Sequence, residues 1–448
     1  MSKRVLVIGA ARSGLAAVDF LRKHHWEVIL TDMRPVTDEA VLEHLQTLDV
    51  QTIWGEQPDV GMISPELIVI SPGIPLTIPP AAAARAQGIP IINETELAFR
   101  AAKAPFVAIT GTNGKTTTTT LVGELLQGGE RKVVVGGNIG LPLVSVVEEL
   151  SAEDVIVAEM SSFQLETTVS FKPKVAVMLN LTPDHLDRHG DMQGYLEAKA
   201  KIFANQNETD YLILNADDGY LAPLADRARS QVIFFSQRHI LKEGVFLRGD
   251  TVVFSRGGVE TSICRREEIT IKGAHNLENA MAAIAAAMIM GVPLEHIRQV
   301  LKDFLGVEHR LEPVRRWHDV LFVNDSKGTN PDAAIKALEA YDEPLILIAG
   351  GKNKGSDFTA LAQSIAKRVK QVILIGQAKD ELRQALEGVG YHRYVEADTY
   401  AEVVRLAAEA AAPGDIVLLS PACASWDMFT SYEERGRLFK ELVNGLAE

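Results

Sequence analysis

The sequence predicts an α/β protein of three domains, each built around a largely parallel sheet. Short, continuously apolar segments alternate with helical segments along the chain, which is typical of strands that helices cover on both faces. Three of these apolar segments run into glycine-rich turns, at Gly9, Gly111 and Gly350. The chain has 448 residues, more than one hydrophobic core normally holds. Together these observations favour three α/β units in a row.

Domain boundaries are expected near residues 94 and 306, so that the domains cover residues 1–94, 95–306 and 307–448. The expected strands are residues 4–8, 27–31, 67–71, 106–110, 155–158, 175–179, 345–349, 371–375 and 415–419. Helices are expected over residues 15–23 and 195–201, and from about Thr117 onward.

Charge and composition narrow the choice of partners. The formal net charge is -14 at pH 7, which argues against nucleic acid as the main partner. Anionic substrates would need local attraction from helix N-termini, lysines and metal ions. The N-terminal segment does not resemble a signal peptide, and the most apolar helical segment, 280–292, is too short to cross a bilayer. Since there are only two cysteines, we expect a reduced, cytoplasmic protein without membrane insertion.

The first glycine-rich turn, Gly9-Ala-Ala-Arg-Ser-Gly14, follows a strand and opens a helix, and Asp32 ends the next strand. This pattern is similar to a dinucleotide-binding turn, but Ala11 replaces the glycine that lets the backbone approach a pyrophosphate. A nucleotide site and a plain strand–helix turn both remain open from these residues.

The second turn, Gly111-Thr-Asn-Gly-Lys-Thr-Thr117, is a stronger signal for phosphate binding. It lies between an apolar strand and a helix, where backbone N–H groups and the helix dipole favour phosphate. Lys115 would reach the β- and γ-phosphates, and the Thr116 hydroxyl would bind Mg²⁺. The usual first glycine of such a loop is replaced by Ile109, so a structural turn is the alternative.

Candidate metal ligands follow the next two buried strands. Glu159 and the segment Asp184-His185 come at strand ends, where ligands gather in doubly wound sheets. Asp184 could equally be a helix N-cap. Lys199 and Lys201 lie in a helix downstream, and a lysine there would ordinarily be solvated, although one face of that helix could turn toward the metal site.

Seven motifs occur in order along the chain: Gly111-Thr-Asn-Gly-Lys-Thr-Thr117, Gly137-Asn138-Ile-Gly140, Glu159-Met-Ser-Ser-Phe-Gln164, Asp184-His185, Ala198-Lys199, His275-Asn276 and His309-Arg310. Together they resemble the ATP-dependent Mur ligase family over essentially the whole chain. Further segments narrow the resemblance to the member that adds D-glutamate: Ser71-Pro72-Gly73-Ile74, Asn324-Asp-Ser-Lys-Gly-Thr329-Asn330, Gly350-Gly351 with Lys354, and Ser420-Pro-Ala-Cys-Ala-Ser425-Trp-Asp-Met-Phe. The Asp-Asn-Pro-Arg signature of the diaminopimelate-adding relative is absent.

The resemblance implies a Rossmann-like N-terminal domain, a central P-loop domain with a parallel sheet, and a Rossmann-like C-terminal domain. It implies a ligase that joins D-glutamate to UDP-N-acetylmuramoyl-L-alanine through an acyl phosphate, with ATP and Mg²⁺, in peptidoglycan precursor synthesis. A folylpolyglutamate synthase should lack the UDP-binding domain. An NAD-dependent oxidoreductase would leave Lys115 unused, and a P-loop switch would hydrolyse ATP without an amino-acid acceptor.

Site residues carried over from the family fall into four groups. The UDP-substrate group is Arg12, Ser13, Asp32, Arg34, Ser71, Gly73 and Asn138. The ATP group is Gly111, Thr112, Asn113, Gly114, Lys115, Thr116, Thr117, Asn276, Asn279, Arg310 and Asp325. The metal group is Thr116, Glu159, His185 and a carbamylated Lys199, and the catalytic residues are Lys115, His185 and Lys199. The D-glutamate group is Lys327, Thr329, Lys354, Ser425, Trp426 and Tyr432, although Tyr432 could be an ordinary, partly buried aromatic.

Overall fold

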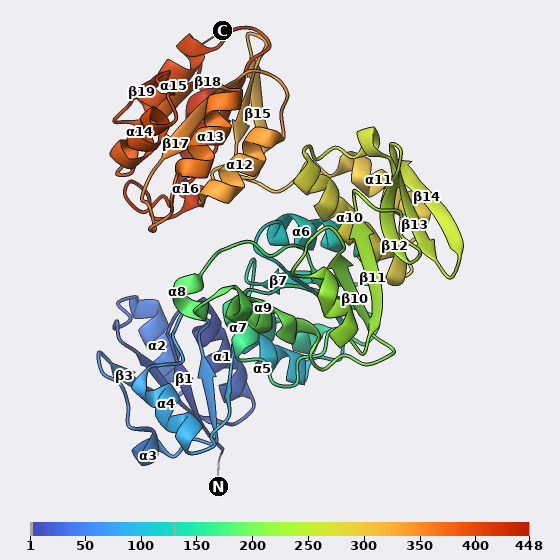
Figure 1. Ribbon diagram of the computed structural model, residues 1–448. Coiled ribbons are helices and arrows are strands. Elements are labelled where there is room, and N and C mark those ends of the chain that lie inside the picture. The colour runs from blue at the N-terminus through green and yellow to red at the C-terminus, as the bar shows by residue number, and fades with distance from the viewer. Residues whose placement is uncertain (1–2, 129–130, 448) are drawn as a thin grey trace. The chain divides into compact units, whose positions relative to one another are not determined.

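The computed structural model describes residues 3–128 and 131–447. Its strands form three sheets of five, nine and six strands (Figure 1). Internal contacts divide the chain into two compact units, Met1–Arg265 with Glu278–Val300, and Arg266–Leu277 with Leu301–Glu448. The first two sheets belong to the first unit and the third sheet to the second. The predicted α/β fold class is confirmed, whereas the boundaries near residues 94 and 306 stay predictions.

The five-stranded sheet has the order β3-β2-β1-β4-β5, and each neighbouring pair is parallel. Its strands are β1 Arg4–Ile8, β2 Glu27–Asp32, β3 Gln51–Trp54, β4 Leu67–Ile70 and β5 Ile91–Ile92, and its helices are α1 Arg12–Lys23, α2 Glu39–Thr47, α3 Val60–Ile63 and α4 Pro79–Ala86. Gly14 is required at the start of α1, because a Cβ there would lie 1.8 Å from the Gly9 carbonyl oxygen. This glycine lets the helix pack close to the end of β1.

The nine-stranded sheet has the order β14-β13-β12-β11-β10-β9-β6-β8-β7, with a parallel core and antiparallel pairing from β12 to β14. Its strands are β6 Phe106–Thr110, β7 Val133–Gly137, β8 Val155–Glu159, β9 Val175–Met178, β10 Tyr211–Asn215, β11 Gln231–Ser236, β12 Gly244–Arg248, β13 Thr251–Arg256 and β14 Val259–Arg265. The helices of this part of the chain are α5 Glu94–Ala101, α6 Lys115–Leu126, α7 Ser162–Glu166, α8 Leu186–His189, α9 Met192–Ala200, α10 Ala274–Ile289 and α11 Leu294–Asp303.

The six-stranded sheet has the order β15-β16-β20-β17-β18-β19, and only its edge strand β15 pairs antiparallel. Its strands are β15 Glu312–Trp317, β16 Val320–Asn324, β17 Leu345–Gly350, β18 Val369–Ile375, β19 Tyr394–Glu396 and β20 Ile416–Leu419. Its helices are α12 Pro331–Glu339, α13 Thr359–Arg368, α14 Lys379–Gly388, α15 Tyr400–Ala410 and α16 Tyr432–Asn444. Separate apolar clusters lie against this sheet, as expected for a sheet with helices on both faces.

The expected strands are all present, each with ends within two residues of the prediction. All three predicted helix starts are too late, and the helix expected from residue 195 begins at Met192. The first helix begins at Arg12, and the helix after the phosphate loop begins at Lys115 because Gly114, with φ 83°, forms its N-cap. Among the described residues, no helix is long and apolar enough to cross a membrane.

The carboxylate of Glu96 fastens α5 to the loop that follows α7. Its side chain is fully buried. Its two oxygens accept hydrogen bonds from the backbone N–H groups of Val169, Ser170 and Phe171 at 3.1, 2.9 and 3.0 Å. Arg100, one turn along α5, donates to it at 2.9 Å. A buried carboxylate with several donors contributes to stability because its loss leaves those donors without an acceptor.

Replacing Glu96 should therefore destabilise the first unit. In Glu96→Gln an amide NH₂ faces backbone donors, and we expect the free energy of unfolding to fall by about 1–3 kcal/mol. Urea unfolding monitored by circular dichroism measures the change. Glu43→Gln, at an exposed position on α2, is the matched control and should unfold like the unmodified chain. Equal midpoints for both variants would contradict this role of Glu96.

Candidate active site

The loop between β6 and α6 has the backbone geometry of a phosphate cradle. Gly111 and Gly114 both have positive φ, 156° and 83°. A Cβ on Gly114 would lie 2.2 Å from the Asn279 side-chain oxygen, so only glycine fits between the loop and α10. Helix α6 begins at Lys115, directly after this glycine, and the dipole of the helix favours an anion at its start.

Two lysine side chains meet at one carbonyl of this loop. Lys115 Nζ donates to the carbonyl oxygens of Gly111 and Thr112 at 2.8 and 2.7 Å. Lys199 Nζ, from α9, donates to the same Gly111 oxygen at 2.8 Å. The two lysines therefore lie on one carbonyl oxygen. The residues alone favoured a solvated Lys199, but only 1% of it is exposed, and its role as a metal ligand stays a prediction.

Burial changes the chemistry of the Lys199 amine. Its pKa lies well below the usual value, first because the amine is removed from water and second because the Lys115 ammonium repels its charged form. Asp184 and Glu159 act in the opposite direction. The amine also lies 4.6 Å from the centre of the Tyr195 ring. Burial and the Lys115 charge therefore raise the fraction of neutral amine, and a neutral lysine amine is a nucleophile.

Glu159 is a buried carboxylate with one unsatisfied oxygen. Its exposed fraction is 2%, and its Oε1 accepts a hydrogen bond from Asn138 Nδ2 at 2.8 Å. Its Oε2 has no hydrogen-bond partner among the described residues. Such an oxygen at a strand end suits a hard divalent cation, which prefers oxygen ligands. The residues present thus fit a magnesium ion, with the Thr116 hydroxyl on the first turn of α6 as a further oxygen donor.

His185 lies in the segment after β9 and forms the N-cap of α8. Its backbone is left-handed, with φ 52°, which is a strained conformation for this residue. Its Nε2 lies 3.5 Å from Asp184 Oδ2, and its ring centre lies 4.8 Å from that of Phe163. The alternative that Asp184 caps this helix is not supported, because His185 occupies the capping position.

The first sheet places Asp32 and Arg34 at the first glycine-rich turn. Asp32 accepts hydrogen bonds from the backbone N–H groups of Ala10 and Arg34 at 2.8 and 2.9 Å. A cleft of about 540 Å³ lies here, lined by Ala10, Ala11, Leu15, Asp32, Arg34, Pro35, Val36, Thr37, Asp38 and Val41. The structure thereby brings together two of the residues expected to bind the UDP group. Ser13 lies on α1, and Ser71 lies 3.5 Å from the Gly9 carbonyl oxygen.

Contacts connect this cleft region to the central sheet. Arg12 Nη2 donates to the Gly140 carbonyl oxygen at 2.7 Å, in the same loop as Asn138. Arg188 Nη2 donates to the Ile74 carbonyl oxygen at 3.3 Å, next to Gly73. These contacts join Arg12 and the Gly73 segment of the first sheet to segments that follow β7 and β9.

In the second unit, Asp325 is buried at the end of β16. Ser420 Oγ donates to its carboxylate at 2.7 Å, and Leu311 N–H donates at 3.3 Å. Burial raises its pKa to about 6, while the Ser420 hydrogen bond and the Arg310 charge act against that rise. Two asparagines are expected to face adenine. Asn276, in the second unit, is buried and donates through Nδ2 to the Lys272 carbonyl oxygen at 2.7 Å. Asn279, in the first unit, has its side-chain oxygen beside Gly114.

The candidate glutamate residues form two lysine–aromatic pairs in the second unit. Lys327 Nζ lies 5.3 Å from the Tyr432 ring centre, and Lys354 Nζ lies 5.8 Å from that of Trp426. Ser425 is buried beside Trp426, which is 62% exposed. Thr329 lies two residues after Lys327, and its backbone N–H donates to the Lys327 carbonyl oxygen at 2.8 Å. Lys327 and Lys354 follow β16 and β17, which both pair with β20, and two ammonium groups at the ends of strands of one sheet suit a ligand with two carboxylates.

Arg435 was missed by the sequence analysis. Its guanidinium, 1% exposed on α16, donates to the Ser326 carbonyl and hydroxyl oxygens at 2.7 and 2.9 Å, and to the Cys423 carbonyl oxygen at 3.2 Å. It therefore ties the Lys327 segment to the Ser425 segment. An arginine in an ordinary charged helix gives no sequence signal for such a role.

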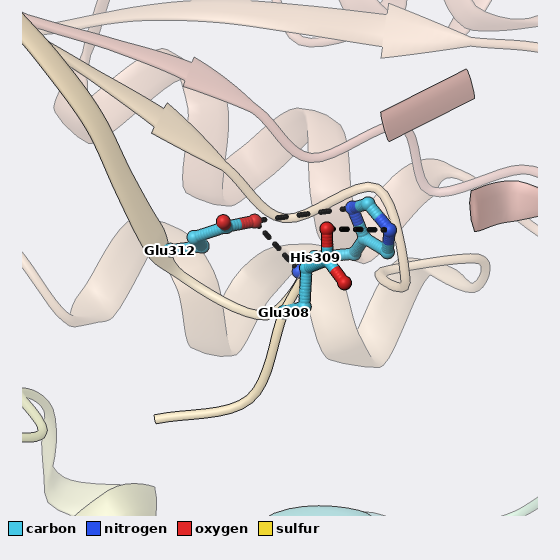
Figure 2. A group of neighbouring side chains, drawn as sticks. All are labelled: Glu308, His309 and Glu312. Carbon is cyan, nitrogen blue, oxygen red and sulfur yellow. Dashed lines mark hydrogen bonds and ion pairs between the residues drawn. The ribbon is translucent and has the colours of Figure 1, made fainter. Parts of the chain in front are cut away.

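Glu308, His309 and Glu312 form a second carboxylate–histidine group, in the second unit (Figure 2). Lys440 Nζ lies 3.0 Å from a Glu308 oxygen and 2.5 Å from a Glu312 oxygen. Asn324 Nδ2 lies 2.9 Å from His309 Nδ1. The Lys440 ammonium from α16 thus pairs with both carboxylates, and the Asn324 amide from β16 pairs with the imidazole. The group therefore links β15 and β16 to α16 and has a structural role.

Three family models match the chain in order: the Mur ligase MurD-like N-terminal domain over residues 3–93, the Mur ligase middle domain over 109–287, and the Mur ligase glutamate ligase domain over 309–423. Together they cover well over half of the chain. The matched order agrees with the order of the three sheets.

Full-length relatives and solved structures agree with these matches. The chain is 53% identical, over 99% of its length and 98% of the relative's, to the UDP-N-acetylmuramoylalanine–D-glutamate ligase of Pelotomaculum thermopropionicum. It is 43% identical to the ligase of the same name from Clostridioides difficile, over 99% of both chains. The fold is similar to that of the UDP-N-acetylmuramate-alanine ligase of Thermotoga maritima, with a TM-score of 0.61, 19% identity and coverage of 98% and 99%. The MurF ligase of the same organism, solved in complex with ADP, gives a TM-score of 0.60 at 16% identity, with coverage of 100% and 96%. The chain belongs to the Mur ligase family.

Proposed function

We propose that this chain is an ATP-dependent ligase that joins D-glutamate to UDP-N-acetylmuramoyl-L-alanine, with release of ADP and phosphate, in peptidoglycan precursor synthesis. Relatives that carry this name are 43–53% identical over nearly the whole chain. The observation in the structure that supports the chemistry most directly is the meeting of Lys115 and Lys199 at the Gly111 carbonyl, with Glu159 close enough to influence the Lys199 pKa. We place the reaction in the cytoplasm, where both buried cysteine thiols would stay reduced.

The chemical difficulty is that a carboxylate is a poor acyl donor. Transfer of the γ-phosphoryl group of ATP to the alanine carboxylate gives an acyl phosphate, with ADP as leaving group. The neutral amine of D-glutamate then attacks the carbonyl carbon, and phosphate leaves from the tetrahedral intermediate. Several anions must converge in this reaction, so catalysis depends on positioning and on charge neutralisation. Lys115, at the start of α6, would neutralise the transferred phosphoryl group.

Lys199 is proposed to act as a carbamate rather than as an ammonium. The neutral amine adds to CO₂ and loses one proton, which converts a cationic group into an anionic oxygen ligand. The lowered pKa of Lys199 supports this step, because the nucleophile is the neutral amine. Thr116, Glu159, His185 and the Lys199 carbamate would hold Mg²⁺. When bound, the ion supplies positive charge to the phosphoryl oxygens.

The remaining residues would bind the three substrates. Asp32 and Arg34 would contact the uracil, and Arg12, Ser13 and Gly73 would lie near the diphosphate. Ser71 would also belong to the UDP-substrate site, and Asn138 and His185 would contact the muramoyl-alanine end. Gly111 to Thr117 with Asn276, Asn279, Arg310 and Asp325 would bind ATP. Lys327, Thr329, Lys354, Ser425, Trp426 and Tyr432 would bind D-glutamate, and the two lysine–aromatic pairs in the second unit support that assignment.

Phosphate release is the assay that tests the proposed function. With ATP, Mg²⁺, UDP-N-acetylmuramoyl-L-alanine and D-glutamate present, we expect steady release, and omission of any one should abolish it. Release that depends on a folate substrate instead would assign the chain to the folylpolyglutamate synthases. Release that needs neither the UDP substrate nor D-glutamate would indicate simple ATP hydrolysis and overturn the proposal.

Lys327→Ala should act mainly on D-glutamate binding. Loss of one ammonium leaves a glutamate carboxylate without its partner, so the KM for D-glutamate should rise at least about 10-fold. The KM for ATP should change little. Lys367→Ala, at an exposed position on α13, is the matched control and should leave both constants unchanged. Equal increases in both constants for Lys327→Ala would indicate a structural role for this lysine.

Lys199→Ala should lose at least about 10²-fold in turnover, because one anionic ligand and its charge are removed. Short carboxylic acids such as acetate should restore part of the activity by supplying a carboxylate in place of the carbamate. Lys201→Ala is the control: its Nζ binds the Glu166 carbonyl oxygen at 2.6 Å on the exposed side of the chain, and its loss should be mild. A Lys199→Ala enzyme with normal turnover would remove Lys199 from the reaction.

A further inference from the structure

A continuous row of rings joins two of the candidate metal ligands. The ring centre of His185 lies 4.8 Å from that of Phe163, and the Phe163 ring stacks on His189 at 5.6 Å with 22° between the planes. His189 in turn lies 5.1 Å from the Tyr195 ring. The Lys199 amine lies 4.6 Å from the centre of the Tyr195 ring. We call His185, Phe163, His189 and Tyr195 the ring row.

His189 is the member of the ring row that is anchored at both ring nitrogens. Its Nε2 lies 3.0 Å from Ser162 Oγ, and its Nδ1 lies 3.3 Å from a Glu166 carboxylate oxygen. Only 3% of its side chain is exposed, and this burial lowers the pKa of the imidazole. His189 thus shares a hydrogen bond with the Ser162 hydroxyl through Nε2, and its Nδ1 faces the Glu166 carboxylate.

The Glu166 carboxylate beside His189 is also held by Arg188, the residue that precedes His189. Arg188 donates to the other Glu166 oxygen at 2.7 Å, and its guanidinium lies 5.2 Å from the Phe163 ring centre. Ser162, Phe163 and Glu166 belong to the short helix α7, whereas His189 ends α8. Contacts with α7 thus hold His189 in place, and the held ring packs against Phe163 on one side and Tyr195 on the other.

We propose that His189 is a positioning residue that sets the spacing between His185 and Lys199, and thereby the affinity of this site for a divalent cation. The inference rests on the proposed function, because it takes His185 and Lys199 as ligands. The His189 ring contacts Phe163, which lies against His185, and Tyr195, whose ring lies below the Lys199 amine, so its influence on the two ligands passes through these rings. Groups that orient metal ligands in this indirect way commonly change metal affinity about 10- to 100-fold when removed.

The test uses Mn²⁺ as a probe, titrated into the full chain with a non-hydrolysable ATP analogue present and detected by electron paramagnetic resonance. We expect His189→Ala to weaken Mn²⁺ binding about 10-fold. His189→Phe, which keeps a ring but loses both nitrogen contacts, should weaken it less, yet measurably. Binding of the analogue without metal should stay unchanged in both variants, because the phosphate loop is intact.

Phe99→Leu is the matched control. Phe99 is half-buried and belongs to a separate ring cluster with Phe106 and Phe171 in the same unit. Its loss should lower thermal stability without changing Mn²⁺ affinity. A Phe99→Leu variant that weakens Mn²⁺ binding as much as His189→Ala would overturn the inference, since general loosening would then explain both.

Two further outcomes are decisive. Unchanged Mn²⁺ affinity in His189→Ala, or in His189→Phe if the alanine variant does not fold, would overturn the role of His189 and leave the proposed function intact. Absence of saturable Mn²⁺ binding in the unmodified chain would instead contradict the proposed metal site itself.

Discussion

Burial of the Lys199 amine against the Gly111 carbonyl is the constraint on which the candidate active site depends. A charged lysine in that position is costly, because it is removed from water and lies on the same carbonyl oxygen as Lys115. A neutral amine, converted to a carbamate, would resolve this conflict and pair with the unsatisfied oxygen of Glu159 around a cation. The glycine loop, α9 and the end of β8 thus supply the groups whose charges must be balanced around Lys199.

Nine parallel strands were predicted from sequence because each is a continuous apolar run between helices, as in Phe106 to Thr110. Other parallel strands, such as β10, β11 and β16, were not predicted. Strands β13 and β14, which form the antiparallel end of the nine-stranded sheet, were not predicted either. Strand β14 is mostly exposed and alternates irregularly, so it carries neither a buried run nor a clean two-residue period. Helix starts were placed late at α1, α6 and α9 because capping and backbone conformation, as at Gly114, determine them more than apolar spacing does.

The residues of the candidate site likewise fall into those that local sequence indicates and those that depend on tertiary packing. Residue types at strand ends indicated Lys115, Thr116 and Glu159, since loop chemistry and strand position are local features of the sequence. The burial of Lys199 depends on how α9 packs against the glycine loop, 88 residues away in the chain, and no periodicity reveals it. Arg435 is a similar case, because its contact with Ser326 spans 109 residues. The substrate assignments came from family resemblance alone.

Nuclear magnetic resonance of the chain equilibrated with ¹³C-bicarbonate tests the central claim most directly. We expect one protein-bound carbamate carbon signal, strengthened by Mg²⁺ and a non-hydrolysable ATP analogue, retained in Lys201→Ala and absent from Lys199→Ala. A spectrum without any carbamate signal in the presence of metal and nucleotide, or a signal that persists in Lys199→Ala, would contradict the account.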